Sequence, residues 1–256
     1  MAAPALSVVV PAYNEAAGIA TTLRSLHATI AGLGLEHEIL VVDNASDDGT
    51  AEVVDALSLA YVRVLRNPVN LGKGASLRRG MLAAGGALRL HCDADCGPSV
   101  DALGRMVALS QRFDVVVGSR LAAGATVGRR QPVRRRIAGR SFGLLCRALL
   151  REPTRDLFCG FKLWRAPAAE AVYRATVLTG WTFDAETLAM ARALGFSITE
   201  TGIAWTDRAG SRLSMPRVIV PVTLELLEAR RRVRRAVRAR AAAAAQPAAE
   251  AAGSRV

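Results

Sequence analysis

Two acidic side chains separated by a single residue are the strongest chemical signal in the sequence. Asp93 and Asp95 flank Ala94 directly after the apolar run 87–92. Side chains two positions apart in an extended chain point to the same side, so both carboxylates can reach one ligand. Carboxylate oxygens suit Mg²⁺ and Mn²⁺, which commonly complete their shells with phosphate and water. The pair therefore predicts a metal site for a phosphorylated substrate, with a pair of solvated turn aspartates as the alternative.

A lysine between two glycines is a second candidate for phosphate binding. Lys73 lies in the run Gly72-Lys73-Gly74, where a helix is predicted to begin, and helix N-termini attract anions through their free N–H groups. The run lacks the glycine order of a P-loop or a dinucleotide-binding fold, which disfavours kinases, NTPases and dehydrogenases. Only Lys73 and Lys162 are lysines among the 34 basic side chains, and this rarity favours a functional lysine over a solvated one.

Alternating strands and helices are predicted to carry these residues. Buried strands are predicted over the apolar runs 6–10, 38–42, 61–65, 87–92 and 114–118. Helices are predicted between them over 16–33, 51–60, 74–84 and 100–110. Such an alternation indicates an α/β fold with crossover connections and a mostly parallel sheet flanked by helices. In the less regular second half we expect helices over 141–150 and 184–194 and strands over 158–164 and 198–205.

Polar residues follow the ends of the predicted strands. In a parallel sheet, ligands bind beyond the carboxyl ends of the strands. The five polar segments expected there are Asn14-Glu15, Asp43-Asn44, Asn70–Lys73, Asp93–Asp95 and Ser119-Arg120. Their convergence on one edge predicts a single site rather than a set of unrelated loops.

Arginines gather in two windows that contain no acidic residue. The first window holds Arg129, Arg130, Arg134, Arg135, Arg136 and Arg140, and the second holds Arg230, Arg231, Arg232, Arg234, Arg235, Arg238 and Arg240. The formal net charge is +12, so the rest of the chain is close to neutral. This distribution excludes a uniformly basic, histone-like protein.

Three interpretations of the arginine windows stay open. The stretch 218–240 has an apolar first half and a basic second half, as in helices that lie on anionic membrane surfaces. Nucleic-acid binding is not expected, because no recognised motif or stacking aromatic residues accompany the arginines. A solvated basic tail is the third interpretation. We find no signal peptide and no apolar run of about 18–20 residues, so we expect a cytoplasmic protein, peripheral on the cytosolic face of a membrane.

Ordered blocks across residues 6–215 resemble glycosyltransferase family 2, whose members have the GT-A fold with a Rossmann-like sheet. The first-half blocks are Val10–Glu15, Val41–Ser46, Asn70–Gly74, Asp93–Asp95 and Gly118–Arg120. The second-half blocks are similar to dolichyl-phosphate β-glucosyltransferases, and the related mannose synthases share most of the pattern. These blocks are Arg155–Trp164, Trp181–Glu186, Trp205–Asp207 and Gly210–Leu213. The resemblance implies a nucleotide-sugar donor, a polyprenyl-phosphate acceptor and Mg²⁺ or Mn²⁺ as cofactor.

The resemblance also implies roles for individual residues. Asp93 and Asp95 are expected to bind the ribose and the metal, and Arg120 to lie near the acceptor phosphate or the diphosphate. The expected catalytic residues are Asp95, Asp156 and Arg120. The expected substrate-binding residues are Pro11, Tyr13, Glu15, Asp43, Asn44, Lys73, Asp93, Ala94, Arg135, Arg140, Asp184 and Arg212. A bridge from Asp156 to Arg155 or Arg120, and a helix-surface charge at Asp184 and Glu186, are the structural alternatives.

Several residues depart from the family pattern or lack a spacing that indicates a role. Asn44 stands where the family usually has a second aspartate, and Gly97 stands where mannose synthases have a glutamine ligand, which favours the glucosyl branch. The three histidines, His27, His37 and His91, have neither triad nor metal spacing and are expected at surface or strand positions. The three tryptophans, Trp164, Trp181 and Trp205, are expected in the core, with a sugar or lipid groove as the alternative.

The predicted function is inverting, metal-dependent transfer of a hexose to a polyprenyl phosphate. Glucose from UDP-glucose is the favoured hexose. The predicted domain spans 1–227, with a nucleotide-binding half at 6–120 and an acceptor half at 121–215. The Ala/Arg-rich remainder, 228–256, is expected to be a frayed helix or disordered. One alternative is a soluble family member that uses GDP-mannose or a small phosphorylated acceptor. Another is a non-catalytic module that binds nucleotide-sugars or nucleic acid and keeps its function after Asp95→Ala.

Overall fold

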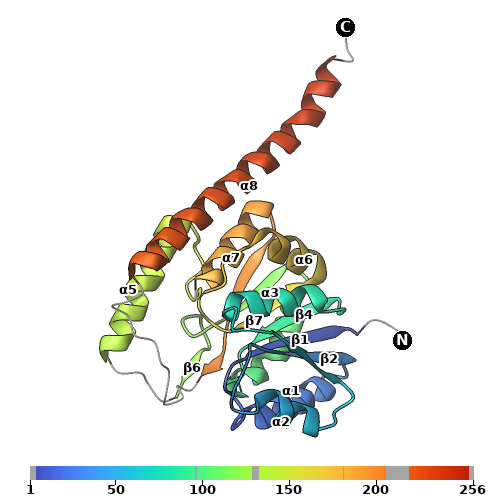
Figure 1. Ribbon diagram of the computed structural model, residues 1–256. Helices are drawn as coiled ribbons and strands as arrows, with labels where there is room; N and C mark the ends of the chain where they lie inside the picture. The colour runs from blue at the N-terminus through green and yellow to red at the C-terminus, as the bar shows by residue number, and fades with distance from the viewer. Residues whose placement is uncertain (1–3, 96, 129–132, 181, 206–218, 254–256) are drawn as a thin grey trace.

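The computed structural model describes residues 4–95, 97–128, 133–180, 182–205 and 219–253 (Figure 1). The larger of two sheets contains β1 (Leu6–Ala12), β2 (His37–Asp43), β3 (Val62–Arg66), β4 (Leu88–Cys92), β5 (Val115–Ser119), β7 (Phe161–Arg165) and β8 (Ile198–Gly202). The smaller sheet pairs β6 (Thr126–Val127) with β9 (Ala204–Trp205). The helices are α1 (Ile19–Gly32), α2 (Thr50–Ala56), α3 (Lys73–Ala83), the 3₁₀ helix η1 (Gly97–Ala102), α4 (Leu103–Leu109), α5 (Val133–Leu150), α6 (Ala166–Ala175), α7 (Phe183–Leu194) and α8 (Ile219–Gly253).

The larger sheet is parallel except at one strand. Its order is β3-β2-β1-β4-β7-β5-β8, and every neighbouring pair that does not include β7 is parallel. The mostly parallel α/β sheet predicted from the alternating pattern is therefore confirmed. Parallel pairing brings the carboxyl ends of β1, β2, β4 and β5 to one side of the molecule, where the polar segments follow them.

The strand β7 comes from the second half of the chain and is inserted between β4 and β5. It is antiparallel to both, and Lys162 lies opposite His91 on one side and Val117 on the other. The pattern of apolar residues predicted a strand here but could not give its direction. The insertion means that the nucleotide-binding and acceptor halves expected from the sequence share one sheet.

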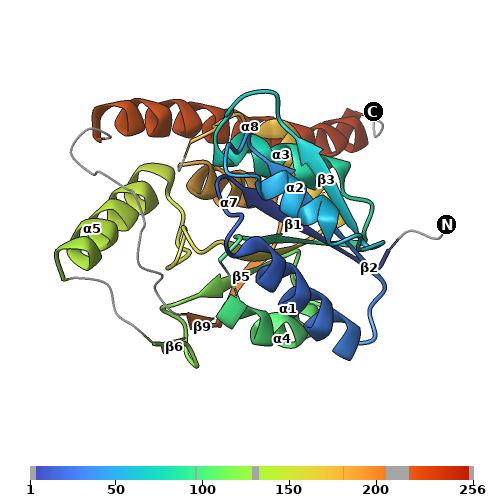
Figure 2. The same cartoon turned by 60° about the horizontal axis from the view of Figure 1, so that its bottom comes forward.

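Helices cover both faces of the sheet (Figure 2). Successive residues of β1 alternate between them: Val8 and Val10 belong to the core that contains α1 and α4, whereas Val9 belongs to the core that contains α3 and α7. All three side chains are fully buried. Strands covered on both faces read as continuous apolar runs, which is why the sequence identified them.

Two helices differ from the expected pattern. Ala166–Ala175 forms α6, a helix not predicted, although Pro167 in its first turn is a typical start signal. Ile219–Gly253 forms α8, which crosses the boundary expected at residue 228 and packs on α5 and α7. It continues past the boundary because Leu226, Ala229 and Val233 form a buried stripe. Among the described residues, no helix is long and apolar enough to span a bilayer.

The close contact of α3 with the sheet can be tested at Gly80. A Cβ at this position would overlap Val9 Cγ1 and would lie 2.9 Å from Val42 Cγ2. We expect Gly80→Ala to lower the free energy of unfolding by about 1–3 kcal/mol, because overpacking outweighs the better helix propensity of alanine. The control Gly143→Ala in α5 meets nothing within 4 Å and should raise it by about 0.5–1 kcal/mol. Urea titrations measure both, and a stabilised Gly80→Ala would contradict the contact.

Candidate functional site

The loops after β1 and β2 are fastened together at the carboxyl edge. The backbone N–H of Asn14 donates to Ser46 Oγ at 3.0 Å, and the N–H of Glu15 donates to Thr50 Oγ1 at 2.9 Å. Asn14 has a left-handed φ of 57°, which an asparagine tolerates better than most residues. Tyr13 stays 46% exposed beside these contacts. The bonds therefore fix the backbone on which Tyr13 and Glu15 are presented.

Asn44 organises the neighbouring loop rather than the open edge. Its buried side chain accepts hydrogen bonds from Asn67 Nδ2 and from the N–H of Leu71, both at 2.9 Å, and donates to Asn70 Oδ1 at 2.7 Å. The amide can donate and accept at the same time, which a carboxylate in its place could not do. This gives a structural reason for asparagine at this position.

Asp43 lies at the end of β2 with one oxygen unused. Its Oδ2 accepts a long hydrogen bond of 3.4 Å from the N–H of Ser46. Its Oδ1 is buried and has no hydrogen-bond partner among the described residues. Buried polar atoms are nearly always satisfied in native proteins. An orphaned acceptor at the carboxyl edge therefore marks a place where a ligand could donate a hydrogen bond.

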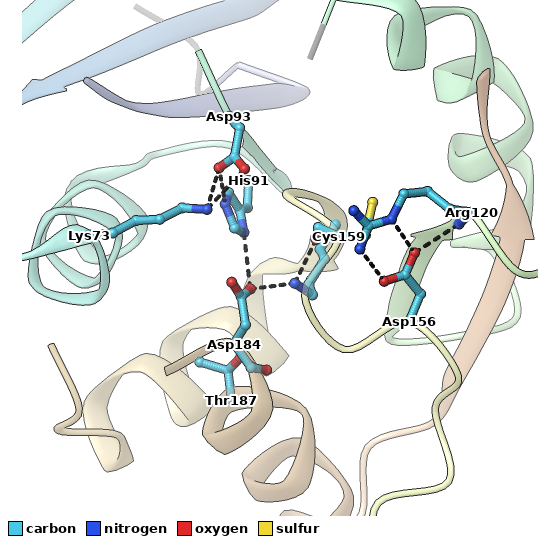
Figure 3. A network of polar contacts seen from close by, with 9 residues as sticks. Lys73, His91, Asp93, Arg120, Asp156, Cys159, Asp184 and Thr187 are labelled. Atoms are coloured by element: carbon cyan, nitrogen blue, oxygen red, sulfur yellow. Dashed lines mark hydrogen bonds and ion pairs between the residues drawn. The ribbon is translucent and has the colours of Figure 1, made fainter. Parts of the chain in front are cut away.

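The carboxylate of Asp93 is held from two sides (Figure 3). Lys73 Nζ lies 2.7 Å from its Oδ1 and 2.9 Å from its Oδ2, and His91 Nε2 lies 3.1 Å from Oδ1. The N–H of Asp93 donates to the carbonyl of Gly160 at 2.9 Å, and a Cβ on Gly160 would overlap the carboxylate. Position 160 must therefore be glycine for Asp93 to keep this conformation.

The charges around Asp93 shift its proton equilibria. Burial by itself would raise the pKa of Asp93, but the Lys73 ammonium and the hydrogen bond from His91 outweigh it, so the pKa lies well below its ordinary value. Burial is the main cause of a lowered pKa at His91, which is fully buried. At neutral pH a neutral His91 can therefore donate its Nε2–H to an ionised Asp93.

A second carboxylate lies beneath His91. Asp184 Oδ1 is ion-paired with Lys162 Nζ and lies 3.9 Å from His91 Nδ1. Lys162 is fully buried and also donates to the carbonyl of Cys159 at 2.7 Å. Asp184 was expected to bind substrate or to be a charge on a helix surface. Its side chain is instead only 3% exposed and contacts Lys162 and His91, and His91 in turn contacts Asp93.

Arg120 and Asp156 form a pair that is separate from the group around Asp93 (Figure 3). Arg120 donates to Asp156 Oδ2 from its backbone N–H at 2.9 Å and from Nε at 2.7 Å, and to Oδ1 from Nη2 at 2.6 Å. Trp205 lies under the guanidinium, 5.2 Å from Cζ to the ring centre. Burial would lower the pKa of Arg120, but the bonds to Asp156 raise it above its ordinary value. The bridge expected as the alternative role of Asp156 is therefore present.

Some of the predicted site residues lie at the carboxyl edge of the sheet, and others lie elsewhere. Asp93, Asp95, Lys73 and Arg120 all follow strand ends or begin a helix at the carboxyl edge, with Asp95 exposed. Arg140 is exposed on α5. The side chains of Arg135 and Arg212 lie outside the part of the chain that the structure describes.

A divalent metal fits the acidic residues after β4. In the described residues, no three side chains of His, Cys, Asp or Glu gather into a metal-binding group. Asp93 and Asp95 supply hard carboxylate oxygens, and Mg²⁺ or Mn²⁺ is often held by one or two carboxylates with phosphate and water as the other ligands. Asp95 is exposed at this edge, where its carboxylate can reach a metal that is also bound to the phosphates of a ligand, so it is a candidate for the principal ligand.

The sequence analysis did not identify the buried residues that hold the site residues in place. His91 precedes Asp93 by two residues, and the two-residue period of a strand could have placed both side chains on one face. Lys162 stands alone in an apolar run, which is a sign of a buried, paired charge. The contact of Arg120 with Trp205 joins residues far apart in the sequence, and no local pattern records it.

Cysteine chemistry can be set aside at this site. Burial raises the pKa of the Cys159 thiol to about 12, so the group is neutral at physiological pH. A neutral thiol is a poor nucleophile and a poor metal ligand. The chemistry of the site therefore belongs to its carboxylates and its basic side chains.

Comparisons with known proteins agree with this arrangement. The family described as Glycosyl transferase family 2 matches residues 7–177. The chain is 34% identical over 227 residues to a dolichyl-phosphate β-glucosyltransferase from Drosophila melanogaster, covering 82% of this chain and 69% of that protein. It is 30% identical over 228 residues to glycosyltransferase AglD from Haloferax volcanii, covering 87% of this chain but only 36% of AglD.

Solved structures share the fold at lower identity. Glucosyl-3-phosphoglycerate synthase from Mycobacterium tuberculosis matches with a TM-score of 0.63 and 20% identity, over 88% of this chain and 81% of that chain. Mannosyltransferase PcManGT from Pyrobaculum calidifontis, solved with GDP-Man and Mn²⁺, matches with a TM-score of 0.57 and 19% identity, over 98% and 81%. The GT-A fold expected from the sequence is thus confirmed.

The ion pair at Asp93 predicts a change in acid stability. Because the pKa of Asp93 is lowered in the folded protein, its ionisation stabilises the fold above the ordinary pKa of 3.8, and this contribution is lost as the pH falls through that value towards the folded pKa. Lys73→Met should raise the folded pKa and so reduce the loss. Urea unfolding between about pH 6 and pH 3 measures the slope. Lys73→Arg should keep the wild-type slope, and an equal slope in Lys73→Met would refute the assignment.

Proposed function

Because the chain belongs to glycosyltransferase family 2, we propose that it transfers a hexose from a nucleoside diphosphate sugar to the phosphate of an acceptor, inverting the sugar carbon. The observation that carries the proposal is the carboxyl edge shared by the carboxylates of Asp43, Asp93 and Asp95 and the ammonium of Lys73. The chain spans 36% of AglD and 66% of a dolichyl-phosphate β-glucosyltransferase from Trichomonas vaginalis, so activity and substrates are inferred from the site.

The nucleotide is proposed to bind at the ends of β1 and β2. The unpartnered Oδ1 of Asp43 could accept an N–H from the base. Tyr13, which is 46% exposed, offers a ring for stacking, and Pro11 and Glu15 lie on the same segment. The hydrogen bonds to the loop after β2 hold this segment in place. The base would therefore meet a prearranged surface.

The diphosphate is proposed to lie between Asp95 and Lys73. A metal bound by Asp95 would neutralise the charge that builds on the departing diphosphate. Asp93 keeps the Lys73 ammonium at the edge through its ion pair and can accept hydrogen bonds from the ribose. Lys73 adds a positive charge close to the leaving group, where charge stabilisation is most effective.

The acceptor phosphate is proposed to bind near Arg120. This phosphate is anionic at neutral pH and needs no strong general base, but the donor diphosphate repels it. Asp156 engages Nε and Nη2 of Arg120, which leaves the N–H groups of Nη1 to face an acceptor oxygen. Because Asp156 neutralises Arg120, further positive charge is needed, and Arg140, Arg135 and Arg212 are the candidates.

Two acceptors are compatible with these groups. Relatives of 30–34% identity are named dolichyl-phosphate β-glucosyltransferases, which favours a polyprenyl phosphate and glucose from UDP-glucose. The structural neighbour glucosyl-3-phosphoglycerate synthase, at 20% identity, was solved with UDP and with phosphoglyceric acid, which makes a small phosphorylated acceptor the second candidate. Labelled UDP-glucose and GDP-mannose, each incubated with either acceptor and with Mg²⁺ or Mn²⁺, would identify the product. Absence of every glycosylated product would refute the proposal.

Asp95 should be essential for transfer. We expect Asp95→Asn to lower kcat by at least about 10²-fold, because the amide cannot supply the charge that holds a metal at the diphosphate. EDTA should abolish turnover, and added Mn²⁺ or Mg²⁺ should restore it. Asp101→Asn, at an exposed acid in η1, is the control and should retain wild-type rates. Full activity of Asp95→Asn or of the chelated enzyme would remove the metal from the mechanism.

We also propose that one end of the molecule rests on an anionic membrane surface. The helices α5 and α8 pack together there (Figure 1). Ile137 and Leu144 of α5 and Leu224 of α8 are each at least 60% exposed. Further along α8, the exposed side chains include Arg234, Arg235 and Arg238, with the exposed Val237 among them. Exposed apolar residues beside a basic face are typical of helices that lie in the headgroup region.

Vesicle flotation tests the membrane surface. The wild-type protein should float with vesicles of phosphatidylglycerol and phosphatidylcholine and stay behind with phosphatidylcholine alone. Replacing Arg234, Arg235 and Arg238 by glutamine should weaken binding by more than about tenfold, because each contributes roughly 1 kcal/mol near an anionic surface. High salt should have the same effect as the triple variant. Equal flotation of the triple variant would overturn the role of this basic face.

A further inference from the structure

A fully buried glutamate joins α8 to the loop before α7. Glu186 Oε2 accepts hydrogen bonds from the N–H groups of Val177 at 3.2 Å and Leu178 at 2.9 Å. Its Oε1 accepts from Arg232 Nε at 2.9 Å. The Glu186 side chain is 0% exposed and that of Arg232 is 17% exposed. One carboxylate therefore ties an arginine of α8 to the backbone of the loop.

This loop supports the turn that carries Lys73. The carbonyl of Thr179 accepts the N–H of Gly74 at 2.8 Å. Gly72 has a φ of +88°, and a Cβ there would lie 2.5 Å from the same carbonyl. The two backbones thus touch without any side chain between them. A shift of the loop would move the Gly72–Gly74 turn and the ion pair of Lys73 with Asp93.

A second contact joins α8 to the same region. Thr182 Oγ1 donates to Glu225 Oε2. Glu225 lies about two helical turns before Arg232 on α8. The loop is therefore held by α8 on both sides of the residues that touch Gly72 and Gly74. Residues of α8 beyond Arg232 make no such contact with it within the described part of the chain.

The charge on Glu186 makes Arg232 hard to replace. A buried carboxylate that loses its partner becomes strongly destabilising, because its charge remains out of water. The two N–H groups of the loop satisfy Oε2, but they supply no opposite charge. Arg232 differs in this respect from its neighbours Arg231, Arg234 and Arg235, whose side chains are exposed.

We propose that Arg232 is a positioning residue for the donor site: through Glu186 it holds the loop 177–179 against the turn that presents Lys73. This inference rests on the proposed function, because it assumes that the donor diphosphate binds beside Lys73. It assigns to the second arginine window a role inside the protein, distinct from membrane contact. The helix α8 is thereby part of the donor site's framework.

Three readouts of Arg232→Met test the proposal. The amides of Val177 and Leu178 should exchange their hydrogens at least about tenfold faster than in the wild type, because their acceptor is displaced. The Kd for UDP with Mn²⁺ should rise by about tenfold or more. KM for the donor should rise more than kcat falls, because Arg232 acts on the loop that supports donor binding and does not contact the reacting groups. Arg232→Lys, which keeps the charge, should restore most of the UDP affinity.

A matched control lies at the other end of α7. Arg192 pairs with Glu152 at 3.0 Å, and Glu152 is also 0% exposed. Arg192→Met should therefore also lower the unfolding temperature, though by less than Arg232→Met because Arg192 is 41% and Arg232 only 17% exposed, and it should leave UDP affinity unchanged. Measurements at least about 10 °C below each unfolding midpoint keep all variants folded.

Each outcome decides the proposal. Protected amides at 177 and 178 in Arg232→Met, or an unchanged Kd for UDP, would overturn it. Equal loss of UDP affinity in Arg192→Met would also overturn it, because the effect would then be general destabilisation. Failure of the wild-type protein to bind either UDP or GDP with Mn²⁺ would instead refute the proposed function, and the exchange measurement would still test the link from Arg232 to the loop.

Discussion

The carboxylate of Asp93 is the group on which the rest of the site depends. It lies between Lys73 and His91, and its backbone is fixed by the carbonyl of Gly160. These three partners come from α3, β4 and the residue directly before β7, so Asp93 joins separate segments of the chain through its carboxylate and its backbone N–H. A partly buried charge can be kept only where opposite charge and hydrogen bonds surround it. The fold supplies these partners before any ligand binds.

The antiparallel strand β7 explains how the second half of the chain reaches the site. By entering between β4 and β5, it places Lys162 opposite His91 and brings Gly160 next to Asp93. The buried pair of Lys162 and Asp184 then attaches α7 to the sheet from below. The residues proposed to bind the donor and the acceptor therefore rest on one continuous sheet, and a change in β7 would affect both.

The sheet and its polar edge could be predicted from the sequence because both are local properties. Buried parallel strands are continuous apolar runs, and the polar residues follow each run directly, as Asp93 follows β4. The direction of β7 and the contact of Arg120 with Trp205 could not be predicted, since they depend on which distant segments meet. The buried side of α8 could not be predicted either, because Leu226, Ala229 and Val233 form a narrow stripe within an arginine-rich sequence.

The two faces of α8 suggest why arginine rather than lysine dominates this helix. The guanidinium of Arg232 binds the buried carboxylate of Glu186 through Nε while Nη1 also reaches Glu228; a lysine could keep the charge beside Glu186 but could not make both contacts in this geometry. Exposed arginines on the opposite face hydrate weakly, as suits a surface that meets phosphate headgroups. One residue type therefore serves both the interior and the surface. If a membrane binds the outer face, the same helix that touches the bilayer also braces the loop beside Lys73, so attachment and donor binding share a structural element.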